Sequence, residues 1–175
     1  MIIIKGRKGL KIYFDCENPE HYLDDISLYG MSDKEVKKAK KRPFITIADI
    51  PIRIEWKKSI YEFVIPKGYT WNGANVPPFA WLLIGQRTDP RFKFASCVHD
   101  YLCENHKLIN HDRYLSTLIF ETLCEQFGRF NDFKRWLMFH SVDNFQKMFG
   151  KDLEGSKWWS TIYNNTYLLL VVALR

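Results

Sequence analysis

The stretch FITIADIPIRIEWKKSIYEFVIPKG, residues 44–68, decides the fold. Its apolar residues alternate with polar or small ones, most clearly at Ile52, Ile54 and Trp56. Alternation with a period of two is typical of a strand that has one face in the core and one in water. Lys57, Lys58 and Ser59 interrupt the pattern, and the apolar run IYEFVIP follows them. We therefore expect an antiparallel β-hairpin with one wet face.

The segments before this hairpin differ from each other in character. Residues 1–15, MIIIKGRKGLKIYFD, are rich in β-formers on both sides of a glycine-containing turn and predict another hairpin. Residues 16–43 are polar and charged, and we interpret them as an insertion or a flexible arm. The basic run DKEVKKAKKR, residues 33–42, is most simply a solvated flap or helix face.

The pattern after residue 77 changes to the helical period. PPFAWLLIG begins with prolines and ends at a glycine, and the next segment, PRFKFASCVHDYLCENH, carries an apolar stripe at i, i+3 and i+4 spacing. The third segment begins at an N-cap candidate, Asn110. The expected helices are 77–85, 90–106, 110–128 and 131–150.

Together these patterns predict an α+β fold, in which N-terminal antiparallel β-hairpins precede a helical part with an antiparallel helix pair. The 175 residues suit a single domain, 1–175, with residues 150–175 as a C-terminal extension. A composition of 46% hydrophobic residues indicates a globular chain. The C-terminal apolar run, residues 167–174, is far shorter than the ~20 residues that a membrane-spanning helix needs.

Charge and cysteine content bear on partners and compartment. The formal net charge of +6 favours anionic partners such as a phospholipid surface, nucleic acid or an acidic polymer. Because no nucleic-acid-reading motif is present, nucleic acid is the least favoured of these. The four cysteines form no framework and the N-terminus has too short an apolar run for a signal peptide, so we expect a cytoplasmic protein at synthesis.

The dipeptide His99-Asp100 places two ionisable groups within an apolar helical stretch. Five residues, 105–109, connect this helix to the next, which predicts antiparallel neighbours. Asp112, near the start of the second helix, could then face the His99 ring and leave its other nitrogen as a general base. Asp100 points about 100° away around the helix, so we expect it to ligate a cation instead. The alternative is a buried polar network that only fixes the helix pairing.

The loop GYTWNGANVP, residues 68–77, has the composition of a cation-binding turn. Asn72 and Gly73 form a strong turn signal, and Gly73 permits a positive φ. The loop could direct main-chain carbonyls and the side-chain carbonyls of Asn72 and Asn75 towards one point, and such oxygen ligands suit calcium (Ca²⁺). In the alternative reading, the loop is a rigid turn in which both asparagines cap the backbone.

Zinc is the less favoured metal. Cys97, His99, Cys103 and His106 crowd one helix, and His99 and Cys103 have the i, i+4 spacing that zinc ligands use. Cys97 and His99, however, do not share a helix face. The pattern therefore lacks a second matched pair of ligands.

The His-Asp dipeptide and the aspartate of the following antiparallel helix resemble the active-site helices of phospholipase A2, including the short form in parvovirus capsids. This resemblance implies that His99 activates a water, Asp100 binds calcium and Asp112 orients His99. The chain departs from the pattern at Cys103, where an aromatic residue is expected. The phospholipase calcium loop is also not present in its usual sequence, and residues 68–77 are the similarly placed loop.

Three motifs in order, GYTWNGANVP, ASCVHDYLC and a helix with an aspartate, resemble a phage and prophage family of unknown function, DUF1353. The resemblance spans residues 60–125, within a family-like core of 44–128. Asn72 stands where that pattern has Asp, Asn75 where it has Ser, and Cys103 where it has Tyr. The resemblance implies an origin in a phage or mobile element and no particular reaction.

Two functional hypotheses follow from these residues. In the first, His99 and Asp112 form the catalytic pair of a calcium-dependent, phospholipase A2-like lipid hydrolase that acts in lysis, entry or attack on other cells, with Asp100, Asn72, Gly73 and Asn75 as metal ligands. In the second, the protein is a non-enzymatic phage protein, either a virion or tail component or an inhibitor of a host defence factor. Its partner is then a host or phage protein, and the polar residues are structural. Either protein could be virion-associated or delivered to another cell.

Overall fold

The larger sheet has four antiparallel strands. In the computed structural model, which describes residues 1–74 and 88–149, the strand order is β1-β2-β5-β6. Ile12 and Phe14 lie opposite Ile54 and Ile52, and all four side chains are buried. The alternation in the sequence therefore selects the face that meets the helices. The strands are β1 (Ile2–Lys5), β2 (Lys11–Phe14), β5 (Ile50–Trp56) and β6 (Ser59–Ile65).

A smaller sheet of three strands, in the order β3-β4-β7, lies beside the first. It contains β3 (Leu23–Asp25), β4 (Phe44–Thr46) and β7 (Thr70–Trp71). The hairpin predicted over residues 1–15 is confirmed. The hairpin predicted over residues 44–68 is present as β5 and β6, with its turn at Lys57 and Lys58. The prediction that residue 44 begins the same hairpin is wrong, because β4 pairs with β3 and β7.

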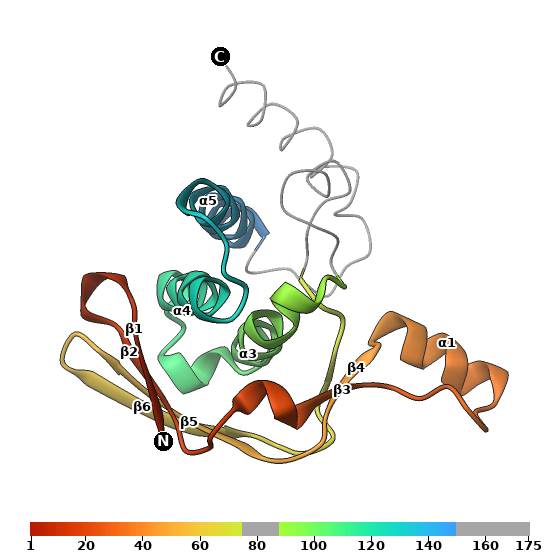
Figure 1. The fold of residues 1–175 in the computed structure, drawn as a ribbon. Helices are drawn as coiled ribbons and strands as arrows, with labels where there is room; N and C mark the ends of the chain where they lie inside the picture. The colour runs from red at the N-terminus through yellow and green to blue at the C-terminus, as the bar shows by residue number, and fades with distance from the viewer. Residues whose placement is uncertain (75–87, 150–175) are drawn as a thin grey trace.

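Residues 16–43, expected as an insertion or arm, have regular structure. They contain a 3-10 turn (Pro19–Tyr22), strand β3 and helix α1 (Asp33–Lys41). Ser32 and Glu35 form a capping box that satisfies main-chain groups at the start of α1. Figure 1 shows α1 projecting to the side of the sheets and the other helices. The segment is thus an arm that is joined to the small sheet through β3 and β4.

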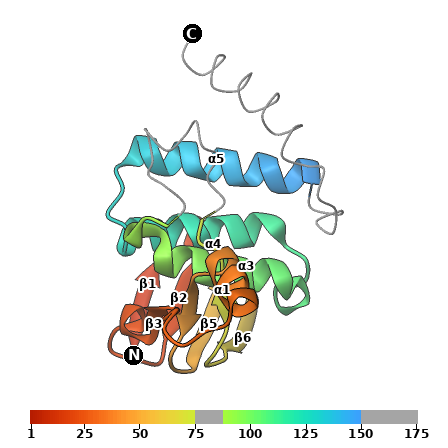
Figure 2. The ribbon, with the colours of Figure 1, turned by 90° about the vertical axis from the view of Figure 1, so that its right-hand side faces the viewer.

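Three longer helices cover the large sheet. Helices α3 and α4 lie directly over it and α5 lies over α4, so the molecule has three layers (Figure 2). These helices confirm the predicted α+β class, whereas the predicted helix 77–85 and extension 150–175 lie outside the described residues. The helices are α3 (Lys93–Glu104), α4 (Arg113–Gln126) and α5 (Asp132–Phe149), with 3-10 turns at Pro90–Phe92 and His106–Ile109.

The start of α4 differs from the sequence expectation. Asn110, expected as its N-cap, adopts a left-handed conformation with φ of 53° at the end of the preceding 3-10 turn. Asp112 caps the helix instead, because its carboxylate accepts the main-chain N–H of Leu115. Among the described residues, no helix has both the length and the apolar composition needed to cross a bilayer.

Candidate functional site

Helix α3 positions the His-Asp dipeptide at the boundary of the core. Its inward face is fully buried at Phe94, Val98 and Leu102, which pack against the sheet side of the molecule. The side chains of His99 and Asp100 lie at the border of this face and are only 14% and 15% exposed. Two ionisable groups at this depth need partners, because uncompensated burial of charge is costly.

The first partner of His99 is its neighbour in the chain. Oδ1 of Asp100 lies 3.6 Å from Nδ1 of His99, which is an ion-pair distance and longer than a hydrogen bond. The expectation that Asp100 points away from the imidazole and cannot act on it is therefore wrong. Rotation about the side-chain bonds brings the carboxylate back towards the ring despite the 100° between the two Cα–Cβ directions.

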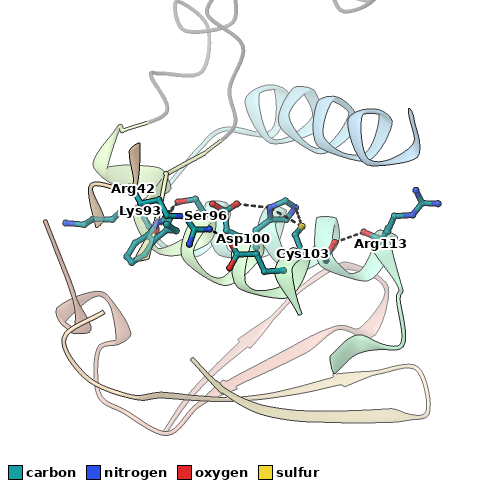
Figure 3. Close-up of polar contacts among 10 residues, drawn as sticks. Arg42, Lys93, Ser96, Asp100, Cys103 and Arg113 are labelled. Carbon is teal, nitrogen blue, oxygen red and sulfur yellow. Dashed lines mark hydrogen bonds and ion pairs between the residues drawn. The ribbon is translucent and has the colours of Figure 1, made fainter. Parts of the chain in front are cut away.

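The thiol of Cys103 lies one turn further along α3. Its Sγ is 3.8 Å from Nδ1 and 3.7 Å from Nε2 of His99. Because the two distances are nearly equal, the sulfur does not lie along the direction of either ring nitrogen. Figure 3 shows Asp100 and Cys103 connected through the same imidazole, in a row along α3. The row brings together a thiol, an imidazole and a carboxylate.

Asp112 lies elsewhere along the helix pair. The α4 ring that packs against His99 is that of Phe120, with 5.2 Å between the ring centroids. Eight residues separate Phe120 from Asp112, and at 1.5 Å per residue they span about 12 Å of the helix axis. The Asp112 carboxylate accepts a hydrogen bond from the main-chain N–H of Leu115 and so caps α4. The carboxylate placed beside His99 is therefore that of Asp100, and a role for Asp112 in orienting the ring stays a prediction.

The loop after β7 meets Asp100 from the other side. Strand β7 is held to α3 by the buried indole of Trp71, which donates to Oγ of Ser96 at 3.1 Å. The amide of the next residue, Asn72, lies against Asp100 and against the main-chain oxygen of Gly73, which has a φ of +82° that favours glycine. Three of the four predicted metal ligands thus lie together, and the fourth, Asn75, lies outside the described residues.

The amide of Asn72 can be oriented in two ways. With its nitrogen inward, it donates to the main-chain oxygen of Gly73 at 2.9 Å and to Oδ2 of Asp100 at 3.0 Å. With its oxygen inward, three oxygens face one another at these distances, which is unfavourable unless a cation or proton lies between them. The orientation of the amide is assigned from the hydrogen bonds that it can form, so it depends on whether a cation or a proton lies between these groups.

Electrostatics couple the same residues. Burial raises the pKa of Asp100, and His99, Arg42 and the main-chain N–H of Asn72 act against that shift. Burial alone would lower the pKa of His99, but Cys103 and Asp100 outweigh it and raise the pKa to about 10. Without a further cation, His99 is therefore an imidazolium at neutral pH and has no lone pair to accept a proton.

Tyr69 completes the site and was not singled out by the sequence analysis. Its hydroxyl is buried and has no hydrogen-bond partner among the described residues. Burial raises the pKa of this hydroxyl well above its ordinary value, and Glu104 and Asp100 raise it further. The ring stacks on Trp71 and meets Tyr101 edge-on. The signal in the sequence was its place in the GY pair that opens the 68–77 loop.

Comparison with known proteins gives one match. The family model described as "Protein of unknown function (DUF1353)" matches residues 49–142, which is more than half of the chain. The chain belongs to the DUF1353 family. No curated protein and no solved structure matches the chain. The DUF1353 match contains Tyr69, Asn72, His99 and Asp100, whereas helix α1 lies before it.

The DUF1353 chain offers few charged ligands at one point. Within residues 1–74 and 88–149, no three His, Cys, Asp or Glu side chains form a group that could hold a metal ion. A cation at Asp100 would therefore depend on neutral oxygens from the Asn72 amide and the Gly73 carbonyl, as calcium accepts. This chemistry differs from a zinc site, which uses nitrogen and sulfur ligands.

Proposed function

We propose that the protein is a calcium-dependent hydrolase that cleaves a phospholipid ester and originates from a phage or another mobile element. The observation that carries the proposal is the position of Asp100, whose Oδ1 faces the imidazole of His99 and whose Oδ2 faces the 72–73 loop. One carboxylate thus joins a candidate base to a candidate cation site. A cation at Asp100 would repel the imidazolium charge and lower the pKa of His99, so that the neutral ring could activate a water. The same cation would stabilise the oxyanion that forms from the ester carbonyl.

The spacing of the oxygens is compatible with calcium, although it equally fits hydrogen bonds from the Asn72 amide. Two oxygens bound to calcium at about 2.4 Å and about 75° apart are about 2.9 Å from each other. The Gly73 and Asp100 oxygens lie at 2.9 and 3.0 Å from the inner atom of the Asn72 amide. The hydroxyl of Tyr69, which has no hydrogen-bond partner among the described residues, also supports the proposal, because buried polar atoms normally have a partner. A bound substrate or ordered water would supply that partner.

A second candidate function rests on the same amide. With the nitrogen of Asn72 inward, Oδ2 of Asp100 and the main-chain oxygen of Gly73 each accept a hydrogen bond without a metal, and the loop is fastened to α3. This orientation favours a non-enzymatic phage protein, such as a virion or tail component or an inhibitor of a host defence factor. In that protein, the network around His99 fixes the packing of α3 against β7.

The test measures fatty-acid release from mixed vesicles of phosphatidylcholine and phosphatidylglycerol, with calcium and with a chelator. We expect release that needs calcium and is lost in His99→Gln and in Asp100→Asn. His106→Gln is the matched control, because His106 is an exposed histidine just beyond α3. It should keep full activity.

The alternative function predicts a different set of results. If the wild-type protein releases no fatty acid with calcium, the hydrolase proposal fails. The structural role then predicts that His99→Gln unfolds at a lower temperature than His106→Gln.

A further inference from the structure

Helix α1 carries a stripe of lysines that the proposed site does not use. Lys34, Lys37, Lys38 and Lys41 have the spacing i, i+3, i+4 and i+7, which places them on one face of the helix. All four side chains belong to exposed residues. The opposite side of the helix contains Ala39, the one buried residue of α1. The stripe therefore points away from the body of the protein.

The charge of this stripe is not neutralised within the described chain. Residues 27–42 contain six basic and two acidic residues, a net charge of +4 out of +6 for the whole chain. One of the acids, Glu35, is engaged by Ser32 in the capping box. None of the α1 lysines forms an ion pair with a described residue. Like charges at i, i+4 spacing repel each other, so an anionic surface that approaches the stripe reduces this repulsion and stabilises the helix.

An exposed apolar tip precedes the stripe. Leu28, Tyr29 and Met31 are 42%, 97% and 36% exposed, and Gly30 turns the chain between them with a φ of +74°. Figure 1 shows this end of the arm projecting away from the sheets. An apolar and aromatic tip next to a lysine stripe suits the boundary between lipid headgroups and acyl chains. A nucleic-acid backbone would use the lysines and not the leucine or methionine.

We propose that residues 27–42 dock the protein on an anionic phospholipid bilayer. The lysine stripe meets the headgroup phosphates and the tip at Leu28, Tyr29 and Met31 enters the interface. At the other end of the arm, Arg42 pairs with Glu104 at the end of α3, so docking is coupled to the helix that carries His99. Docking needs no hydrolysis and is independent of the proposed function.

The test is co-sedimentation of the full chain with phosphatidylcholine vesicles that contain or lack phosphatidylglycerol. Each lysine near an anionic surface contributes about fivefold to binding, so Lys34→Gln with Lys38→Gln should weaken it about 25-fold. The matched control, Lys58→Gln with Lys67→Gln, removes the same charge from exposed lysines outside the arm. It should weaken binding only slightly. Tyr29→Ser should also weaken binding.

Three results would overturn the docking proposal. The first is no binding of wild type to anionic vesicles, and the second is an equal loss in the stripe and control variants. The third is tighter binding to a DNA duplex than to vesicles, unchanged in Tyr29→Ser, which would assign the stripe to nucleic acid. Stripe-dependent vesicle binding without fatty-acid release would support docking and end the hydrolase proposal. His99→Gln should bind vesicles as wild type does.

Discussion

Replacing Asn72 by aspartate tests the contact between the loop and α3 directly. The substitution keeps the shape of the side chain and puts a second carboxylate 3.0 Å from Oδ2 of Asp100. At an effective dielectric constant of about 20, two charges at this distance repel by about 5 kcal/mol. The pair avoids part of this repulsion by taking up a proton, at a cost of about 1.4 kcal/mol for each unit by which the pH exceeds the ordinary pKa of the carboxyl group. We therefore expect a loss of about 2–3 kcal/mol in the free energy of unfolding.

Calcium should reverse this loss. A loss of about 2–3 kcal/mol corresponds to a fall of about 4–10 °C in the unfolding temperature of a chain of this size. A cation at about 100 times its dissociation constant returns about 2.7 kcal/mol, so Asn72→Asp should regain at least the wild-type midpoint with calcium. Thermal unfolding in chelator and in calcium measures both effects. The control, Gln126→Glu, adds the same charge at an exposed position and should change either midpoint by no more than about 1 °C.

The reasoning fails if Asn72→Asp unfolds at the wild-type temperature in chelator. Residues 72 and 100 would then not be in contact, and the 72–73 loop would not form a site with Asp100. If the variant is destabilised and calcium gives no recovery, the contact is real and the cation site is refuted.

Three further predictions concern the same elements. Ser96→Ala should lower the free energy of unfolding by about 1–3 kcal/mol, because the buried indole N–H of Trp71 loses its acceptor. Chemical denaturation measures this loss, and an unchanged midpoint would contradict the hydrogen bond between Trp71 and Ser96. Asp112→Ala should lower the free energy of unfolding by about 0.5–2 kcal/mol, because α4 loses its N-cap hydrogen bond to Leu115. Asp112→Ser should keep both the stability and any activity of the wild type. An Asp112→Ser protein that is stable but inactive would instead support a role of Asp112 in orienting His99. Burial lowers the pKa of His99, but Cys103 and Asp100 outweigh it and raise the pKa to about 10, so the folded state holds this proton more tightly than the unfolded state. In chelator, the free energy of unfolding of wild type should therefore fall relative to His99→Gln as the pH rises from 6.5 to 10, by at most about 1.4 kcal/mol per pH unit, and parallel curves would refute the shift.

The sequence predicted the elements of the fold better than their partners. Alternation at Ile52, Ile54 and Trp56 and the turn at Lys57 are local signals, and the structure contains the hairpin that they indicate. The separation of β4 from β5 depends on pairing with β3, which lies about twenty residues earlier in the chain. The alternation changes phase between Ile47 and Ile50, across Ala48 and Asp49, and the prediction of a single hairpin did not take this break into account.

For the candidate site too, the sequence indicated the residues better than the contacts between them. The structure brings Asn72 to Asp100, because the preceding residue, Trp71, is hydrogen-bonded to Ser96 one turn earlier on α3. The metal site that these residues were expected to form stays a prediction. The predicted contact between His99 and Asp112 required the axial register of two helices. That register is set by the 3-10 turn and by two consecutive left-handed residues, Asn110 and His111, whose conformation the sequence does not reveal. Asn110 and Asp112 are both good N-caps, so their order in the chain could not decide which one begins α4.

The small β3-β4-β7 sheet limits how far this chain can be truncated before it fails to fold. The family match begins at residue 49, after β1, β2 and β4, yet β5 hydrogen-bonds to β2 and β7 to β4. A fragment of residues 49–142 would leave both of these strands with an open edge and would remove Ile12 and Phe14 from beneath the helices. Open edges and bare apolar surface cause aggregation. The unit that folds is thus larger than the segment that the family model matches, and an expressed fragment should include β1 to β4.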